Sequence, residues 1–329
     1  MEIGKRVGLR YGKATRDAFG EALVELGHEN PDIVVVDGDV ANSTRTESFA
    51  REFPDRFFSV GIAESNLVGV ASGLAASGKT AVAASFACFL LCNAYDQIRM
   101  GVAFPAANVK LVGSHSGISI GADGPSQMAI EDIALAASLP NFTVVVPADE
   151  PSARAATRAM FAMQGPCYLR TGRPKVPVVY PAGIDFELGR ASTLREGGDV
   201  TIMACGLMVA IALEAAHDLS AEGVDARVID MHTVKPLDRQ TIYRAARETG
   251  AIVTAEEHVL YGGLGSAVAL AVGELLPVPM EFIGIKNTYA ESGRPEELLD
   301  KYGLMPRHVA EGVRRVMARK RGDRPPYSN

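Results

Sequence analysis

The chain has 329 residues, a length that corresponds to about two domains of ordinary size. Its 33 Lys and Arg against 39 Asp and Glu leave a net charge of -6, without the basic excess of a protein that binds nucleic acid over a broad surface. With 47% hydrophobic and 22% charged residues the chain can bury substantial cores, which excludes disorder for most of it.

The beginning of the chain and its cysteines indicate the compartment. The first 13 residues carry five charges and no apolar core of signal-peptide length, so we do not expect export. The stretches 57–78 and 80–95 are apolar, but the first is broken by polar residues and the second is shorter than the roughly 20 residues of a membrane span. We expect both to be buried inside a large domain, with no membrane partner. Four cysteines without a zinc-binding pattern favour a reduced, cytoplasmic protein: Cys88, Cys92, Cys167 and Cys205.

Short apolar runs alternate with longer helical patterns along the chain. The runs are typical of strands in parallel sheets and cover residues 33–36, 109–112, 143–146, 201–204, 226–229 and 252–254. The helical patterns cover residues 15–26, 151–163, 207–219 and 239–248. This alternation predicts an α/β fold with doubly wound sheets.

A segment of linker composition divides the chain. Residues 173–198 contain three prolines and several glycines, so we predict a first domain over residues 1–172 and a second over residues 199–329. The tail, residues 317–329, is basic and then rich in proline, and we expect it to be a frayed end.

Glu64 is the only ionisable residue in the 22-residue stretch 57–78, and it stands at the start of a helix rich in Ala and Gly. A carboxyl group buried there is costly unless it has a partner. Backbone N–H groups and the helix dipole could satisfy it. Alternatively, the apolar site holds the carboxyl group so that it hydrogen-bonds or exchanges a proton with a ligand.

Two further features are candidates for a site. Residues 113–127 form a Gly-rich polar loop directly after a predicted strand, where open α/β sheets gather their ligands. Phe86 and Phe89 are three residues apart, so a helix would place them on one face, either as core or as a wall for a flat ring.

Other motifs give little support for a nucleotide-binding or metal-binding site. No G-x-G-x-x-G follows a strand, which disfavours dinucleotide binding. His258 lacks the spacing of a metal ligand, and we expect it at the surface or at an interface.

Several strings, taken in order, resemble the C-terminal two-thirds of transketolase, a thiamine diphosphate enzyme. The resemblance runs from about Lys13 to about Gly312 and rests on residues 14–20, 37–39, 42–44, 62–64, 94–100, 113–132 and 167–174. It implies a pyrimidine-binding domain followed by a transketolase C-terminal domain.

The resemblance also implies roles for single residues. Glu64 would hydrogen-bond N1′ of the cofactor's aminopyrimidine, which favours the tautomer that removes the C2 proton, while the difficult chemistry belongs to the cofactor. Phe86 and Phe89 would form an aromatic wall against the pyrimidine, with Phe89 stacking on it. His115 and Gln127 would join Glu64 as catalytic residues.

For the substrate, the resemblance implies a cradle for a sugar phosphate at Arg16, Ser43, His115 and Arg173, because Arg can bind a phosphate in a bidentate manner. Asp123 and Gln127 would contact sugar hydroxyls. Two departures affect the choice of sugar. The stretch 86–96 is one residue longer than in full-length transketolases, with Asn93 near where an Arg is common, and Ala122 replaces an acid.

The resemblance does not extend to one domain of full-length transketolase. Full-length transketolase has a preceding domain that holds Mg²⁺ and the diphosphate through a G-D-G motif and a downstream Asn-Asn pair. Here residues 37–40 read Asp-Gly-Asp-Val, and no Asn-Asn pair occurs. We therefore expect this chain to bind the pyrimidine end only and to hold no metal. A separate N-terminal subunit would supply the diphosphate-binding domain and Mg²⁺ in an α2β2 assembly.

The expected reaction is the transfer of a two-carbon ketol unit between a ketose phosphate and an aldose phosphate, as in the pentose phosphate pathway. The β subunit of 2-oxo acid dehydrogenases and deoxyxylulose phosphate synthase are alternatives, but residues 113–117 and 124–127 resemble the transketolase loops and not theirs. A non-catalytic partner that kept the fold is the alternative from another class. The retention of Glu64, both Phe residues and the phosphate cradle argues against it.

Overall fold

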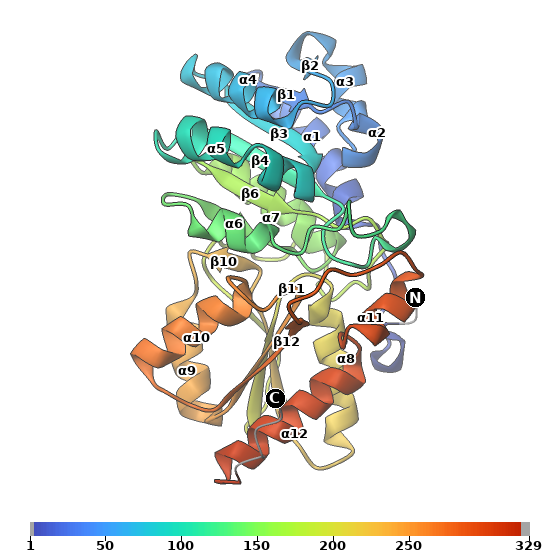
Figure 1. Ribbon diagram of the computed structural model, residues 1–329, viewed down its shortest axis with the longest axis vertical. Helices are drawn as coiled ribbons and strands as arrows, with labels where there is room; N and C mark the ends of the chain where they lie inside the picture. Colours follow the sequence, from blue (N-terminus) through green and yellow to red (C-terminus); the bar gives the residue numbers. More distant parts are fainter. Residues whose placement is uncertain (1–2, 324–329) are drawn as a thin grey trace.

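Two largely parallel sheets, one for each half of the chain, organise residues 3–323, which the computed structural model describes (Figure 1). The first sheet has the strand order β10-β5-β6-β4-β3-β1-β2 and the second β12-β11-β8-β9-β7. Neighbouring strands in both sheets pair in parallel, except that β10 is antiparallel to β5 and β7 is antiparallel to β9. The strands are β1 (Ile33–Asp37), β2 (Phe57–Ser59), β3 (Thr80–Phe86), β4 (Val109–Ser114), β5 (Thr143–Val145), β6 (Cys167–Arg170), β7 (Ser192–Arg195), β8 (Val200–Ala204), β9 (Ala226–Asp230), β10 (Thr233–Lys235), β11 (Ile252–Val259) and β12 (Met280–Ile285).

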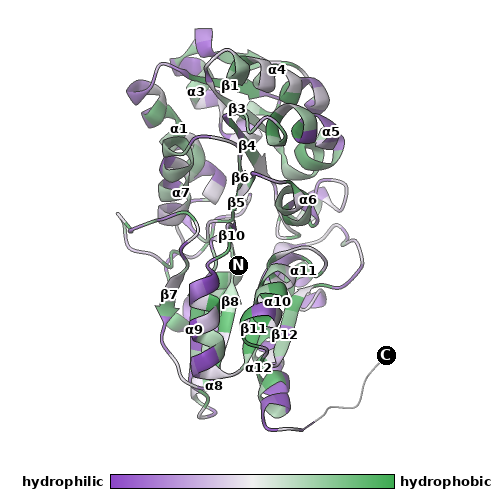
Figure 2. Cartoon of the chain, turned by 90° about the vertical axis from the view of Figure 1, so that its left-hand side faces the viewer, coloured by the Kyte–Doolittle hydropathy of each residue, from purple (hydrophilic) through white to green (hydrophobic). Residues whose placement is uncertain are grey.

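Helices cover both faces of each sheet, which confirms the predicted α/β class. On the first sheet, α1, α3 and α7 lie on one face and α4, α5 and α6 on the other (Figure 2). On the second, α9 and α10 lie opposite α8 and α12 (Figure 1). Their bounds are α1 (Thr15–Glu29), α3 (Glu47–Glu52), α4 (Glu64–Ala76), α5 (Tyr95–Gln97), α6 (Asp132–Ser138), α7 (Glu150–Ala162), α8 (Met208–Ser220), α9 (Arg239–Thr249), α10 (Leu264–Leu275) and α12 (Pro306–Lys320).

Short elements fill the connections between these helices and strands. The helices α2 (Ala41–Thr44) and α11 (Pro295–Lys301) lie in such connections, as do the 3₁₀ turns η1 (Lys5–Val7), η2 (Pro54–Arg56) and η5 (Gly121–Asp123). Two π-helical segments, η3 (Phe89–Asn93) and η4 (Ile98–Ala103), flank α5. A π-helical turn accommodates an extra residue and is frequent at functional sites.

The local sequence explains why the regular elements form where they do. The strand β1 reads Ile-Val-Val-Val-Asp and is buried at every position, as β-branched residues are in a sheet covered on both faces. The helix α7 begins with a capping box between Asp149 and Ser152 and has a proline in its first turn.

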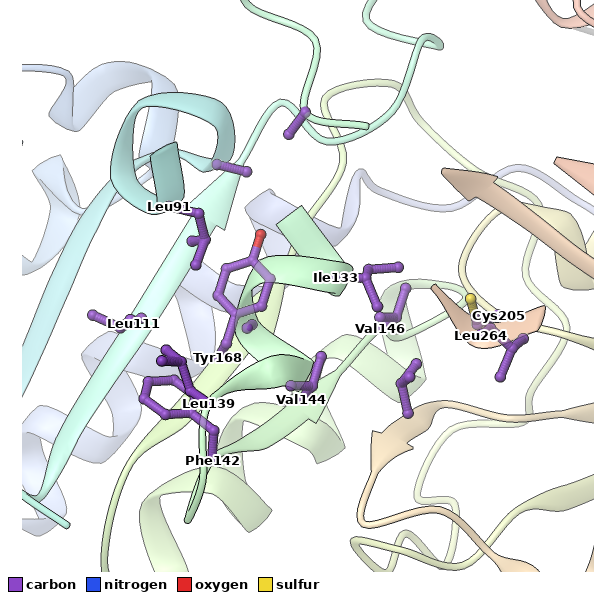
Figure 3. Close-up of a cluster of buried hydrophobic side chains, with 14 of the residues drawn as sticks. Leu91, Leu111, Ile133, Leu139, Phe142, Val144, Val146, Tyr168, Cys205 and Leu264 are labelled. Carbon is purple, nitrogen blue, oxygen red and sulfur yellow. The ribbon is translucent and has the colours of Figure 1, made fainter. Parts of the chain in front are cut away.

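A continuous apolar cluster joins the two halves. It includes Leu111 and Tyr168 of the first sheet, Ile133 of α6, and Cys205 and Leu264 of the second half (Figure 3). Strand β10 adds to this connection, because it follows β9 of the second sheet in sequence and pairs with β5 at the edge of the first. The two halves therefore pack as neighbours through buried contacts and not only through the linker.

The six predicted strands and four predicted helices all form near the predicted residues. The predicted linker, residues 173–198, contains β7, which is one of the two edge strands of the second sheet. Within residues 3–323, none of the helices combines the length and apolarity needed to cross a membrane.

Two expectations were wrong. The stretch 57–78 is not wholly buried, because Phe58 is 40% and Ile62 82% exposed and α4 buries only one face. The tail is not frayed at its start, because residues 317–320 continue α12 and the Lys320 ammonium group donates to Thr249 O. The remainder of the predicted tail, residues 324–329, lies outside the described residues.

We predict that Asp149 is a main anchor of the linker. Its buried carboxylate accepts the backbone N–H groups of Ser152, Val179 and Tyr180 at 2.9, 2.7 and 2.9 Å. Asp149→Ala should lower the free energy of unfolding by about 3 kcal/mol, because charged acceptors of buried N–H groups are lost. Denaturant unfolding followed by circular dichroism measures this loss. The exposed Asp185 on the same linker is the control, and equal losses for Asp149→Ala and Asp185→Ala would contradict the prediction.

Candidate functional site

The carboxyl ends of β1, β3, β4 and β6 lie at one edge of the first sheet, together with the N-terminal ends of α1 and α4. Polar and aromatic side chains that are far apart in sequence gather at this edge, which is where parallel sheets bind ligands. The predicted site residues follow these strand ends or lie in the first turns of these helices.

Glu64 is the first residue of α4 and is only 3% exposed. Its carboxylate accepts a hydrogen bond from Ser85 Oγ at 3.0 Å and one from Asn93 Nδ2 at 3.3 Å. Both partners are neutral side chains from other elements, β3 and the π-helix η3. No cation pairs with the carboxylate among these contacts, so its oxygens can accept a further hydrogen bond from a donor on a ligand.

The π-helix η3 lies between Phe86 and Asp96, where the resemblance to transketolase predicts one residue more than usual. A π-helical turn can accommodate an extra residue, which fits this prediction. The Asn93 amide group at the end of η3 donates to Glu64. Ser65 Oγ donates to the Asn93 carbonyl oxygen at 3.1 Å and fixes the position of that residue.

Three rings form a parallel stack beside Glu64. The rings of Phe86 and Phe89 lie 5.8 Å apart with an interplanar angle of 10°, and the His115 ring lies 3.8 Å from Phe86 at 11°. The expectation of a shared helix face was wrong, because Phe86 ends β3 and Phe89 begins η3. The chain turn between them nevertheless makes the rings parallel, and both remain half-buried.

His115 is neutral, and its tautomer follows from its partners. The ring is 2% exposed, and burial, with the positive charges of Arg16, Arg173 and Arg45, lowers its pKa to about 3. Arg16 Nη1 lies 3.3 Å from Nε2 and can only donate, so Nε2 is the acceptor and Nδ1 carries the proton. Nδ1 then donates to Ser114 Oγ at 2.8 Å.

Arg16 lies at the start of α1 and faces the segment that contains Ser43. Its Nη1 donates to Ser43 O at 2.9 Å, while its buried Nε has no hydrogen-bond partner. A buried guanidinium N–H without a partner indicates that an acceptor on a ligand completes the site. The Ser43 segment is organised by Asp37, whose carboxylate accepts from Val40 N and Thr44 Oγ1 at 2.7 and 2.8 Å.

Arg173 and Asp123 form the far side of the site. Arg173 Nη1 lies 2.9 Å from Asp123 Oδ2 and donates to Ile120 O at 3.1 Å. Gln127 lies in the same loop, where its Oε1 accepts from Ser126 Oγ at 2.6 Å and its backbone carbonyl accepts from Cys88 Sγ at 3.4 Å.

These contacts join the sequence candidates into three groups. The first is Glu64 with its two donors, the second is the stack of Phe86, Phe89 and His115 continued by Arg16 and Ser43, and the third is Arg173 with Asp123. Gln127 contacts none of the other candidates. Sequence reasoning missed Ser85 and Asp37 as the residues that hold Glu64 and the Ser43 segment. In the described part of the chain, His, Cys, Asp and Glu side chains form no cluster that could hold a metal ion.

Two family models match the chain. The model "Transketolase, pyrimidine binding domain" matches residues 12–178, and "Transketolase, C-terminal domain" matches residues 189–309. The chain belongs to the transketolase family.

Individual relatives of the transketolase family match over different lengths. "Transketolase-like protein 1" from Bos taurus is 43% identical over 92% of this chain, but this chain spans only 51% of that protein. "6-deoxy-6-sulfo-D-fructose transketolase subunit SqwH" from Clostridium sp. is 40% identical over 93% of this chain and 95% of its own length. A solved structure, "Split gene transketolase, inactive beta4 tetramer", is 50% identical, with a TM-score of 0.89, over 94% of this chain and 100% of that one.

We predict that the ring of His115 stays neutral throughout the physiological range. Its pKa of about 3 lies below the ordinary 6.5, so the unfolded chain binds a proton more readily and this residue's contribution to stability falls as the pH drops from about 6.5 to about 3. Ring ¹⁵N shifts in NMR spectra should show no protonation above about pH 5. Arg16→Ala should raise the midpoint, whereas Arg190→Ala on the exposed linker should not; a wild-type midpoint near 6.5 would contradict the prediction.

Proposed function

We propose that this chain is the pyrimidine-binding subunit of a two-subunit transketolase that uses thiamine diphosphate to transfer a two-carbon ketol unit between a ketose phosphate and an aldose phosphate. The supporting observation is the buried Glu64 carboxylate, held only by neutral donors beside parallel aromatic rings and next to a cationic cradle. The family of the first domain supports the choice of cofactor.

The residues present fit the pyrimidine half of the cofactor. The Glu64 carboxylate would hold a proton at a ring nitrogen, and Ser85 and Asn93 would fix the orientation of its two oxygens. Phe89 would lie against the flat face of the ring. When bound, thiamine diphosphate supplies the nucleophilic carbon and the electron sink that carbon–carbon cleavage requires.

The positive charges of Arg16 and Arg173 suit a substrate phosphate. The positive charges of Arg16 and Arg173 act together on His115, which indicates a positive potential that a dianion would neutralise. Both ring nitrogens of neutral His115 already have partners, Arg16 and Ser114, so we assign His115 the role of orienting Arg16 in the cradle. Asp123 and Gln127 would hydrogen-bond to sugar hydroxyls, and Ser43 would line the part of the site that holds the phosphate.

A partner subunit is proposed on three grounds. The solved relative is described as inactive and as a β4 tetramer, and it has the same extent as this chain. The Clostridium relative is described as a subunit. In this chain, Phe58 and Ile62 expose apolar surface immediately before Glu64, as expected where a second subunit covers a cofactor. We propose that this partner carries the diphosphate-binding domain with its Mg²⁺, in an α2β2 assembly.

We predict that the purified chain shows no ketol transfer with thiamine diphosphate, Mg²⁺ and sugar phosphates. Activity should appear on addition of an N-terminal subunit that carries the diphosphate-binding domain, because only the two together enclose the cofactor. Ile62→Asp should reduce activity by preventing assembly while the chain remains folded; size-exclusion chromatography of the mixture separates the two effects. Full activity of the chain alone would refute the two-subunit proposal.

We predict that Arg173 selects phosphorylated sugars. In the assembled enzyme, Arg173→Ala should raise KM for sugar phosphates by about tenfold or more, because a charge-assisted contact to phosphate is lost. Sugars without a phosphate should keep their KM within about twofold. Steady-state kinetics with a matched pair of phosphorylated and free sugars provides the comparison. An unchanged ratio of the two KM values would remove Arg173 from the phosphate cradle.

A further inference from the structure

The C-terminal domain reaches into the first domain through the end of β11. Glu257, near this end, is 6% exposed, and its carboxylate accepts the backbone N–H of Ser119 at 2.5 Å. Ser119 lies in the loop between His115 and Asp123, which we call the substrate loop (residues 115–123). A side chain of one domain therefore holds the loop that carries candidate substrate ligands of the other.

The substrate loop is shaped to receive this carboxylate. Gly117 has a φ of +77°, and a Cβ atom there would lie 2.2 Å from the Glu257 carboxyl carbon. Any other residue at position 117 would collide with Glu257 and also strain the backbone. The Gly117 N–H donates to Ala129 O at 2.7 Å, which closes the loop at its base.

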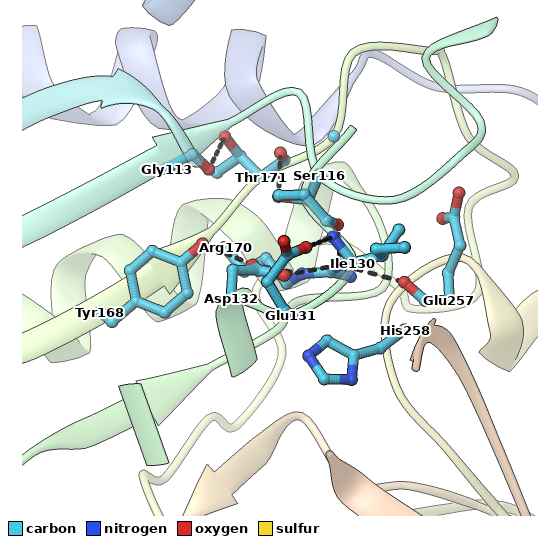
Figure 4. Close-up of polar contacts among 12 residues, drawn as sticks. Gly113, Ser116, Ile130, Glu131, Asp132, Tyr168, Arg170, Thr171, Glu257 and His258 are labelled. Atoms are coloured by element: carbon cyan, nitrogen blue, oxygen red, sulfur yellow. Dashed lines mark hydrogen bonds and ion pairs between the residues drawn. The ribbon is translucent and has the colours of Figure 1, made fainter. Parts of the chain in front are cut away.

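A buried network fixes the strand that carries Glu257 (Figure 4). Arg170 Nη2 donates to Glu257 O and to Ala129 O, both at 3.0 Å, and the Arg170 guanidinium pairs with Asp132. Val259 N donates to Ile130 O at 2.8 Å. These hydrogen bonds hold the backbone on both sides of the domain boundary in place. The Glu257 carboxylate therefore contacts the substrate loop from a fixed strand end.

The neighbouring Glu256 shows what a purely structural acid does here. Its buried carboxylate accepts Leu264 N at 2.7 Å and Gly265 N at 2.8 Å, which caps the start of α10. Successive residues of a strand point to opposite sides, so Glu256 faces its own domain while Glu257 faces the substrate loop. Both acids are buried glutamates, but they have different partners.

The contact continues from Glu257 to the phosphate cradle. Ser119 is bonded to Glu257, and the next residue, Ile120, supplies the carbonyl oxygen that accepts from Arg173 Nη1. Movement of Ser119 would therefore displace the carbonyl that orients this guanidinium. We propose that Glu257 is a positioning residue of the C-terminal domain that holds the substrate loop, and through it Arg173, in the form that binds a substrate phosphate.

This inference rests on the proposed function, and phosphate binding by the purified full chain tests it. Isothermal titration calorimetry with inorganic phosphate gives Kd for the wild type, Glu257→Gln and the control Glu256→Gln. Glu257→Gln should weaken binding about tenfold, because a neutral amide accepts the Ser119 N–H less strongly than a carboxylate does and a displaced ligand loses much of its affinity. Glu256→Gln should stay within about twofold while it lowers thermal stability. Gly117→Ala displaces the loop from an intact Glu257 and should weaken phosphate binding as Glu257→Gln does.

The outcomes separate this proposal from the proposed function. Arg173→Ala serves as the reference for loss of the cradle. One outcome is that Arg173→Ala abolishes phosphate binding while Glu257→Gln and Gly117→Ala bind phosphate as the wild type does. This result would support the phosphate cradle and show that Glu257 has no positioning role. If the wild type and Arg173→Ala are alike in binding phosphate, the cradle itself is wrong and this proposal fails with it. Equal weakening by Glu256→Gln and Glu257→Gln would show a loss of stability and overturn the proposal.

Discussion

The burial of the Glu64 carboxyl group is the constraint on which the rest of the site depends. A buried carboxylate without partners costs several kcal/mol, and a paired cation would be the ordinary solution. Among the described residues no cation pairs with Glu64, and two neutral donors, Ser85 and Asn93, hold it instead. A carboxylate oxygen can accept more than one hydrogen bond, so a proton-bearing ring nitrogen could be the next partner of Glu64. The exposed Ile62 beside it marks the side that remains open in the single chain.

The proposed phosphate cradle carries the opposite charge to the Glu64 carboxylate. Arginines and a histidine kept neutral by burial and by their charges leave an excess of positive charge, which an anion would balance. Two domains share the work of holding these groups in place. The first domain supplies Arg16, His115 and Arg173 at the carboxyl edge of its sheet, and the C-terminal domain supplies the Glu257 carboxylate that fixes the loop after His115. The C-terminal domain thereby has a role at the site as well as in packing.

The sequence predicted the parts of this arrangement that have a local signal. An acid isolated in an apolar stretch marked Glu64, and a polar loop after an apolar strand marked His115. Ser85 and Glu257 carry no such signal, because their roles depend on contacts with residues 21 and 138 positions away. The shared helix face for the Phe86 pair was wrong since β3 extends to Phe86 before the chain turns. The π-helix that places Asn93 could not be derived from periodicity, which does not distinguish a π-helical turn from an α-helical one over so short a segment.

The central claim is that Glu64 holds a proton at the ring of thiamine diphosphate, and proton exchange at the cofactor tests it most directly. Deuterium exchange at C2 of the bound cofactor, followed by quenched-flow NMR in the assembled two-subunit enzyme, compares the wild type with Glu64→Gln. Cofactor affinity measured on the same samples separates binding from exchange. The account predicts exchange slower by about 100-fold or more in the variant, with the cofactor still bound. Exchange at the wild-type rate in Glu64→Gln would contradict it.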